Sequence, residues 1–436
     1  MSTVVSMSEG ASNTLGFFDR TAKQMITGQL GELREGQLQI IDRVGTTVYG
    51  QPSDLFVTMH VREPRFFRHA VLGGTLSVAE SYLNGDWDCD DLTALFRLFV
   101  RNMNAADQID RGVSRVAQWS HRLYHWWHAN SKQGSRRNIE AHYDLGNDFF
   151  RLWLDDTMAY SSGVFQHGDA SLQEASVEKF DRVCRKLELT PEDHLLEIGT
   201  GWGGMAMHAA GQYGSRVTTT TISKRQLEYA RERVELAGLQ HLVTLQHDDY
   251  RDLRGEFDHL VSIEMIEAVG HRYLDDYFRQ CGRLVRSTGS FVLQAIVMPE
   301  RVHANYLKCV DFIQRYVFPG GCLPSVGSIL ASVGRTTDFR LAHVEDMAPH
   351  YSRTLKLWRE TFEQRLEVVR EQGYSERFIR LWRYYLAYCE AVFAERHVGV
   401  VQIRLDKPKC RRDPLDFESR VSAGTAARLV PLGEQF

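Results

Sequence analysis

The stretch LEIGTGWGG, residues 196–204, decides the fold of this 436-residue chain. Gly199, Gly201 and Gly204 have the spacing G-x-G-x-x-G and follow the apolar run HLLEIG at residues 194–199. Glycines at these positions let a backbone approach a ligand between a strand and the N-terminus of the next helix. The spacing alone leaves open whether the turn holds a dinucleotide, a different cofactor or no ligand.

Helix and strand patterns alternate on both sides of this turn. Phe180, Val183, Cys184 and Leu187 mark one face of a preceding helix. Strands are expected at 216–222, 241–246, 257–265 and 289–297, a helix at 223–238, and mostly helix over 303–395. Such alternation predicts a doubly wound α/β sheet, a Rossmann-like fold, with helical insertions after residue 300.

The rest of the chain suggests a second, smaller domain. Its length favours two domains. Residues 38–61 alternate like short strands, residues 77–102 resemble one helix, and 129–137 are typical of a boundary. We therefore expect an N-terminal α+β domain over 1–135, a catalytic domain over 136–405 and a flexible tail over 406–436.

Composition excludes several classes of protein. The hydrophobic and charged fractions, 43% and 25%, are those of a soluble globular protein, and the net charge of −4 argues against nucleic acid as a partner. Seven scattered cysteines without a C-x-x-C pair argue against a disulfide framework and a zinc site. The start of the chain has no signal-peptide pattern, and no apolar run reaches the ~18 residues that span a bilayer. We expect a cytoplasmic protein that meets lipid from the membrane surface.

A nicotinamide dinucleotide fits the turn poorly. Such a site needs an acidic residue about 20 positions beyond the glycines, and no carboxylate lies between Glu197 and Glu228. Glu197 instead suits the amino group of a methionyl cofactor. Ser223 and Gln226 have the spacing of a capping box, although Gln226 could also reach a ribose.

Several ordered blocks resemble the cyclopropane fatty acid synthase family. They are residues 142–165, 195–204, 221–226, 249–253, 257–270, 318–325 and 384–393. The resemblance implies methyl transfer from S-adenosylmethionine (SAM) to the cis double bond of unsaturated acyl chains in membrane phospholipids. The cofactor-binding residues it implies are Tyr160, Ser161, Glu197, Gly199, Gly201, Gly203, Thr221, Ser223, Gln226, Tyr250 and Arg251.

The same resemblance implies a bound bicarbonate as the base. Glu267, Tyr351 and the backbone of Ile296 match the residues that hold it, whereas Ser162 stands in place of Cys, and Ala268 and Gln294 in place of His. These departures put bicarbonate in doubt, because Ser and Gln cannot carry a proton as His does. We expect Glu267 either to anchor bicarbonate or to act as the base itself, with helix N-terminal pairing as the alternative role.

We expect cyclopropane fatty acids as the product, with a methylene- or methyl-branched acyl chain as the alternative. Methyl transfer creates a carbocation, for which Phe149, Phe150, Tyr160, Phe312, Tyr316, Phe318 and Tyr351 are candidate wall residues, with at least half expected in the core. The position of the base then selects a cyclopropane or a methylene- or methyl-branched chain, the latter made in some relatives with a flavin-dependent reductase. A homodimer is a family expectation. A phospholipid-binding homologue without catalysis, or a methyltransferase acting on a soluble small molecule, is the alternative.

One segment suggests how the chain meets the membrane. HRLYHWWH at 121–128 places aromatic rings among basic side chains, and residues 101–137 hold seven Lys/Arg and two acids, a local charge of +5. This composition is typical of a peripheral anchor on anionic lipid. The alternative is an inter-domain helix with buried tryptophans.

Overall fold

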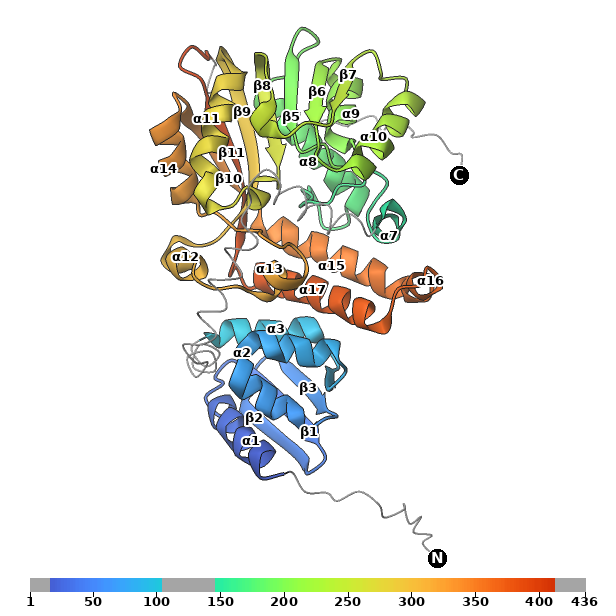
Figure 1. The fold of residues 1–436 in the computed structure, drawn as a ribbon, viewed down its shortest axis with the longest axis vertical. Helices are drawn as coiled ribbons and strands as arrows, with labels where there is room; N and C mark the ends of the chain where they lie inside the picture. Colours follow the sequence, from blue (N-terminus) through green and yellow to red (C-terminus); the bar gives the residue numbers. More distant parts are fainter. Residues whose placement is uncertain (1–15, 104–145, 412–436) are drawn as a thin grey trace, which may run out of the picture. The chain divides into compact units, whose positions relative to one another are not determined.

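The computed structural model describes residues 16–103 and 146–411, which divide into two compact units (Figure 1). One unit comprises residues 1–117 and 376–384, and the other 118–375 and 385–436. The aromatic stretch 121–128, the boundary expected at 129–137, nearly all of the basic segment and the tail beyond 411 lie outside the described residues. Within 16–103 and 146–411, no helix is long and apolar enough to cross a bilayer.

The first unit contains the α+β domain expected from the sequence. Its four-stranded sheet has the order β2-β1-β3-β4, with β1 antiparallel to β2 and parallel to β3. Three of these strands confirm the alternation seen at residues 38–61. The strands are β1 Gly36–Asp42, β2 Gly45–Gln51, β3 Phe56–Val61 and β4 Trp87–Cys89, and the helices are α1 Phe17–Leu30, α2 Arg65–Leu83 and α3 Leu92–Arg101.

The single helix expected over 77–102 is wrong. Helix α2 ends at Leu83, the chain turns through Gly85 with a φ of +80°, and strand β4 intervenes before α3. Asp91 then caps α3 by accepting a hydrogen bond from the backbone nitrogen of Ala94. The apolar period at Leu92 and beyond belongs to α3 alone, so it could not reveal the break that precedes it.

The second unit is built on a seven-stranded sheet of order β10-β11-β9-β8-β5-β6-β7. Strands β5 to β9 run parallel, and β10 and β11 are antiparallel additions at one side. The doubly wound sheet is thus confirmed. The strands are β5 His194–Ile198, β6 Arg216–Thr220, β7 Val243–Gln246, β8 Phe257–Ile263, β9 Val285–Val297, β10 Arg340–Asp346 and β11 Gly399–Asp406.

Helices cover both faces of this sheet because its strands are apolar on both sides. Leu195 and Val261 pack on one face against α8 and α9, whereas Leu196 and Leu260 pack on the other against α11 and α14. Figure 1 shows these helix pairs on opposite sides of the sheet. The helices up to α11, with the 3₁₀ turns, are α7 Asn147–Arg151, α8 Leu172–Leu187, α9 Gly204–Tyr213, α10 Lys224–Leu236, η1 Tyr250–Asp252, η2 Ile266–Ala268, η3 His271–Tyr273 and α11 Leu274–Leu284.

The segment after residue 300 is largely helical, as expected, but it also contains β10, and β11 follows it. Neither strand was predicted. Residues 407–411, expected to begin a flexible tail, also pack on the sheet: the backbone nitrogens of Lys407 and Lys409 donate to Gly289 and Ser287. The later helices are α12 Glu300–Tyr306, α13 Phe312–Tyr316, α14 Val326–Thr336, α15 Ala348–Gln364, α16 Leu366–Glu371 and α17 Glu376–Ala394.

The strand order reverses between β5 and β8. From β5 the chain continues through β6 and β7 on one side, and β8 then returns to pair on the other side of β5. Ligands of open α/β sheets bind beyond the carboxyl ends of the strands at such a switch point. The glycine turn follows β5, and the segment Glu264–Glu267 follows β8, so both predicted parts of the site meet there.

Candidate active site

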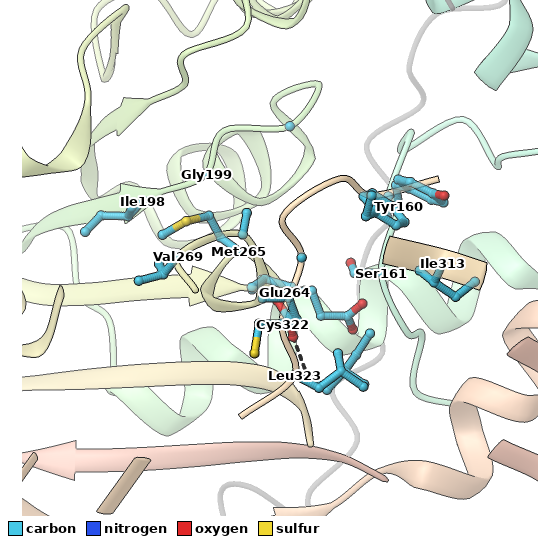
Figure 2. Close-up of a pocket in the computed structure, with 18 of the residues that line it drawn as sticks. Tyr160, Ser161, Ile198, Gly199, Glu264, Met265, Val269, Ile313, Cys322 and Leu323 are labelled. Atoms are coloured by element: carbon cyan, nitrogen blue, oxygen red, sulfur yellow. Dashed lines mark hydrogen bonds between the residues drawn. The ribbon is translucent and has the colours of Figure 1, made fainter. Parts of the chain in front are cut away.

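A cavity of about 460 Å³ opens beyond the carboxyl ends of β5 and β8, within the second unit. Figure 2 draws residues from both ends of it, with Ile198 and Gly199 on one side, Tyr160, Ser161 and Ile313 on the other, and Glu264 between them. The inserted helices complete the wall, with Ile313 in α13 and Tyr351 in α15. The cavity therefore joins an end beside the glycine turn at the sheet to an end among the inserted helices.

The glycine turn and Glu197 form the sheet end of the cavity. Gly199 and Gly201 have φ angles of +106° and +52°, which favour glycine, and both line the cavity. The carboxylate of Glu197 accepts a 2.6 Å hydrogen bond from the Thr219 hydroxyl. Burial raises the pKa of Glu197 to about 8, so a cationic ligand group beside it would favour its charged form.

The other predicted cofactor residues divide into two groups. Tyr160, Ser161, Thr221, Gln226, Tyr250 and Arg251 line the cavity. Ser223 and Gly203 lie behind the lining. Ser223 caps α10 through the backbone nitrogen of Gln226, whose carboxamide oxygen accepts from the Thr221 hydroxyl at 3.0 Å. Gly203 starts α9, where an added Cβ would lie 3.2 Å from the Cβ of Ala230.

The predicted catalytic residues also divide into lining and supporting positions. Glu267, Tyr351 and Ile296 line the cavity, whereas Ser162 and Gln294 are fully buried behind it. The Ser162 hydroxyl donates to the backbone oxygen of Gly163. Its backbone nitrogen and the amide of Gln294 point instead to a residue that the sequence analysis did not select, Glu264.

Glu264 is the carboxylate around which these residues gather. One oxygen accepts from the Ser162 nitrogen at 2.9 Å and from Gln294 Nε2 at 2.7 Å, and the other accepts from the Tyr351 hydroxyl at 2.7 Å. Burial raises the pKa of Glu264, although these three donors oppose the shift. Its backbone is left-handed, with a φ of +47°, a costly conformation that such side-chain contacts can hold in place.

Glu267 is less well satisfied. Its Oε1 accepts a 2.6 Å hydrogen bond from the Ile296 nitrogen, and its Oε2 is buried without a hydrogen-bond partner in the described structure. Burial, and then the charge of Glu264, raise the pKa of Glu267 to about 8. Three donors favour the charged form of Glu264, whereas Glu267 has one, so the geometry favours the proton of this pair on Glu267.

Lys179 is a second residue that the sequence analysis missed. It is fully buried in α8, and its Nζ donates to the Ser161 hydroxyl at 2.6 Å. Burial lowers its pKa to about 8, while Glu264, Asp155 and Glu197 oppose the shift. Its charge partly offsets the carboxylates of the site. Its position on a helix gives no sequence signal of this role.

Aromatic side chains surround Tyr160. Its ring lies 5.4 Å from those of Phe150 and Trp358, and its hydroxyl lies 2.8 Å from that of Tyr385. Of the seven aromatic residues proposed as walls, Tyr160, Phe318 and Tyr351 line the cavity, whereas Phe149, Phe150, Phe312 and Tyr316 do not. Phe149, Phe150 and Phe312 are buried and Tyr316 is half-buried, so three of the seven lie in the core away from the cavity, fewer than the half that was expected.

Comparisons with known proteins agree with this architecture. The model of the family described as mycolic acid cyclopropane synthetase matches residues 130–403. A tuberculostearic acid methyltransferase of Mycobacterium tuberculosis is 38% identical over 78% of this chain and 79% of the relative. A cyclopropane-fatty-acyl-phospholipid synthase of Escherichia coli is 34% identical over 84% and 91%. A solved mycolic acid cyclopropane synthase complexed with SAH and CTAB is 31% identical, covers 62% of this chain and 98% of its own, and has a TM-score of 0.59.

Proposed function

The chain belongs to the mycolic acid cyclopropane synthetase family of SAM-dependent methyltransferases. From this premise we propose that it methylates the cis double bond of an unsaturated acyl chain in a phospholipid. We further propose that Glu264, rather than bicarbonate, accepts the proton that this reaction releases. The observation that carries the proposal is the cluster of three hydrogen-bond donors around the Glu264 carboxylate at the cavity wall.

The sheet end of the cavity fits SAM. Glu197 offers a buried carboxylate to an ammonium group, and side chains at Gly199 and Gly201 would strain a left-handed backbone that lines the cavity. Gln226 and Arg251 add polar groups at the far side of this end. When bound, SAM supplies an electrophilic methyl group on a sulfonium.

The reacting alkene needs positioning and dry surroundings. An isolated double bond is a weak nucleophile, so its placement in line with the methyl supplies much of the catalysis. The new carbon–carbon bond uses the π electrons and leaves a cation on the neighbouring acyl carbon. The π face of Tyr160 and the negative charge of Glu264 would stabilise this cation in a cavity lined largely by apolar side chains.

Glu264 suits the role of proton acceptor better than Glu267. Three donors favour its charged form, and its raised pKa makes it a stronger base than an exposed carboxylate. Glu267 already carries its proton near neutral pH, because burial and Glu264 raise its pKa to about 8. In this proposal the Glu264 carboxylate is the base, a role that the family resemblance assigned to a bound bicarbonate.

The acyl chain would occupy the helical end of the cavity. Apolar side chains line it there, among them Ile313, Phe318, Leu323, Val392 and Phe393. Such a lining suits hydrocarbon and gives little to a small polar substrate. The names of the relatives, a fatty-acyl-phospholipid synthase and a tuberculostearic acid methyltransferase, support a lipid substrate, and we place the reaction at a membrane surface.

We propose a methylene-branched product, because the tuberculostearic acid relative is named a methyltransferase and not a cyclopropane synthase. A 1,2-hydride shift would move the cation to the methyl-bearing carbon. Loss of a proton from the methyl group to Glu264 would then form a C=CH₂ double bond, which is the methylene branch. A flavin-dependent reductase could add hydride and a proton to give a methyl branch. Proton loss without the hydride shift would close a cyclopropane, which the phospholipid synthase relative makes the second candidate.

The test uses the full chain, SAM and vesicles of unsaturated or saturated phospholipid in buffer freed of bicarbonate. We expect a mass gain of one CH₂ in the unsaturated lipid only, and we expect the product to take up hydrogen on catalytic hydrogenation. A product that resists hydrogenation would identify the cyclopropane instead. Dependence on added bicarbonate would contradict the role of Glu264, and turnover of neither lipid would contradict the proposed function.

A further inference from the structure

A row of buried polar side chains leads away from Glu264. Gln294 in β9 lies directly opposite Gln402 in β11, and both side chains are fully buried. Gln402 Nε2 donates to Gln294 Oε1 at 2.9 Å, and Lys186 Nζ donates to Gln402 Oε1 at 2.7 Å. Lys186 is buried at the end of α8 and pairs with Glu345 of β10. The row connects an ion pair behind the sheet to the carboxylate at the cavity.

The chemistry of the two ends fixes the direction of every hydrogen bond in this row. An ammonium group can only donate, and an ionised carboxylate can only accept. Each glutamine between them must therefore turn its oxygen toward Lys186 and its nitrogen toward Glu264. Reversing one amide would bring two donors or two acceptors together, which is costly in a buried site.

We propose that Lys186 and Gln402 are positioning residues that hold the amide nitrogen of Gln294 toward Glu264 and so keep this carboxylate ionised. The inference rests on the proposed role of Glu264 as proton acceptor. Neither residue lines the cavity, so both act through Gln294. The second hydrogen of Gln294 Nε2 points to the backbone oxygen of Ser162 at 3.5 Å, which supports the same orientation.

Other charged groups face the two ends of the row. Glu345 lies beside Lys186, and Arg182 and Arg185 are also near it. Lys179, Tyr351 and Glu267 face Glu264. Burial lowers the pKa of Lys186 to about 8, against the opposing effect of Glu345. Measurements below pH 8 therefore keep the ammonium charged.

The sharpest test is Gln402→Glu. The new carboxylate would keep, and strengthen, the pairing with Lys186, but it would demand a donor from Gln294 and so turn the Gln294 oxygen toward Glu264. We expect the acid limb of the pH profile of kcat to rise by about one unit, with the KM for unsaturated vesicles unchanged. Gln402→Met, which breaks the row without reversing it, should give a smaller shift in the same direction.

A merely structural role predicts the opposite order. Gln402→Met would then be the more damaging change, because it removes both hydrogen bonds, and Gln402→Glu would have the pH profile of the wild type. That result would overturn the proposal. If Gln402→Glu does not fold, Lys186→Met replaces it, with Lys407→Met as the matched control. Lys407 is another buried lysine, paired with Asp338, and only Lys186→Met should shift the acid limb.

A second readout separates this inference from the proposed function. The carboxyl carbon of Glu264 can be titrated by NMR in ¹³C-glutamate-labelled protein without substrate, and Glu264→Gln identifies its resonance. We expect Gln402→Glu to raise the pKa of Glu264. An unshifted pKa together with an inactive Glu264→Gln would refute the row alone. A shifted pKa together with an active Glu264→Gln would refute the proposed function alone.

Discussion

Replacing Glu267 with glutamine is expected to raise the free energy of unfolding, and to raise it more as the pH increases. The Glu267 carboxyl is buried, with Ile296 as its one donor to Oε1 and a buried Oε2 that has no hydrogen-bond partner in the described structure. Burial and the charge of Glu264 raise its pKa from 4.5 to about 8. The neutral amide copies the shape of the protonated acid that the fold prefers.

The magnitude follows from the pKa shift. A raised pKa contributes stability that is fully present below the unfolded value near 4.5 and is lost as the pH rises through about 8. At about 1.4 kcal/mol per unit, a shift of roughly 3.5 units corresponds to about 5 kcal/mol in total. The advantage of the glutamine variant should therefore be about 1 kcal/mol at pH 5, about 3 kcal/mol at pH 7 and about 5 kcal/mol at pH 9.

Urea unfolding of the full chain, followed by the fluorescence of its eight tryptophans, measures this difference at the three pH values. Glu390→Gln is the control, because Glu390 is also buried but forms an ion pair with Arg359. It should lose stability rather than gain it. An advantage of Glu267→Gln that stays constant with pH, or a variant less stable than the wild type at pH 9, would refute the assignment of the proton to Glu267.

Three further predictions follow from the site and from helix α9. Glu264→Gln should lower methyl transfer to unsaturated vesicles by ~10²–10⁴-fold with the thermal midpoint nearly unchanged, and a rate near that of the wild type would contradict its role. Tyr351→Phe removes a donor to the charged carboxylate, so the acid limb of kcat should move to higher pH by about one unit; an unmoved limb would count against the contact. Gly204→Ala should lower the free energy of unfolding in urea by about 1–3 kcal/mol, because the added Cβ would lie 2.9 Å from the backbone oxygen of Thr157. Gly211→Ala on the same helix is the control, because its Cβ would meet no atom closer than 3.8 Å and should not destabilise the chain.

The sequence was informative where one periodicity dominates. The central strands β5, β8 and β9 contain apolar runs that are buried on both faces, and the glycine turn fixes where β5 ends, so the doubly wound sheet could be predicted. Strand β10 could not, because most of its side chains are exposed and its sequence RLAHVED has no continuous apolar run. Strand β11 contains two buried polar residues, Gln402 and Arg404. Because they interrupt its apolar pattern, the sequence did not identify it as a strand.

The site was predictable to the level of its elements. The block after β8 was recognised and Glu267 chosen from it, yet the spacing E-x-x-E also contained Glu264, and that second acid was the available signal. The choice between the two depends on Ser162, Gln294 and Tyr351, which come together only in the folded sheet. Lys179 lies on α8, whose sequence has an amphipathic helical pattern. That pattern does not show that the Lys179 side chain lies near the carboxylates of Glu264, Asp155 and Glu197.

The position of β11 has a consequence for synthesis of the chain. It pairs with β9 on one side and β10 on the other, although both partners are translated before it. Until β11 leaves the ribosome, one edge of β9 is unpaired and β10 has no strand to pair with. Lys186 and Gln294 also lack the glutamine that joins them. Nascent domains with unpaired strands are prone to aggregate. The surroundings of Glu264, the proposed proton acceptor, are therefore among the last features to be organised, and a ribosome stalled between residues 346 and 399 would present a sheet in which they are incomplete.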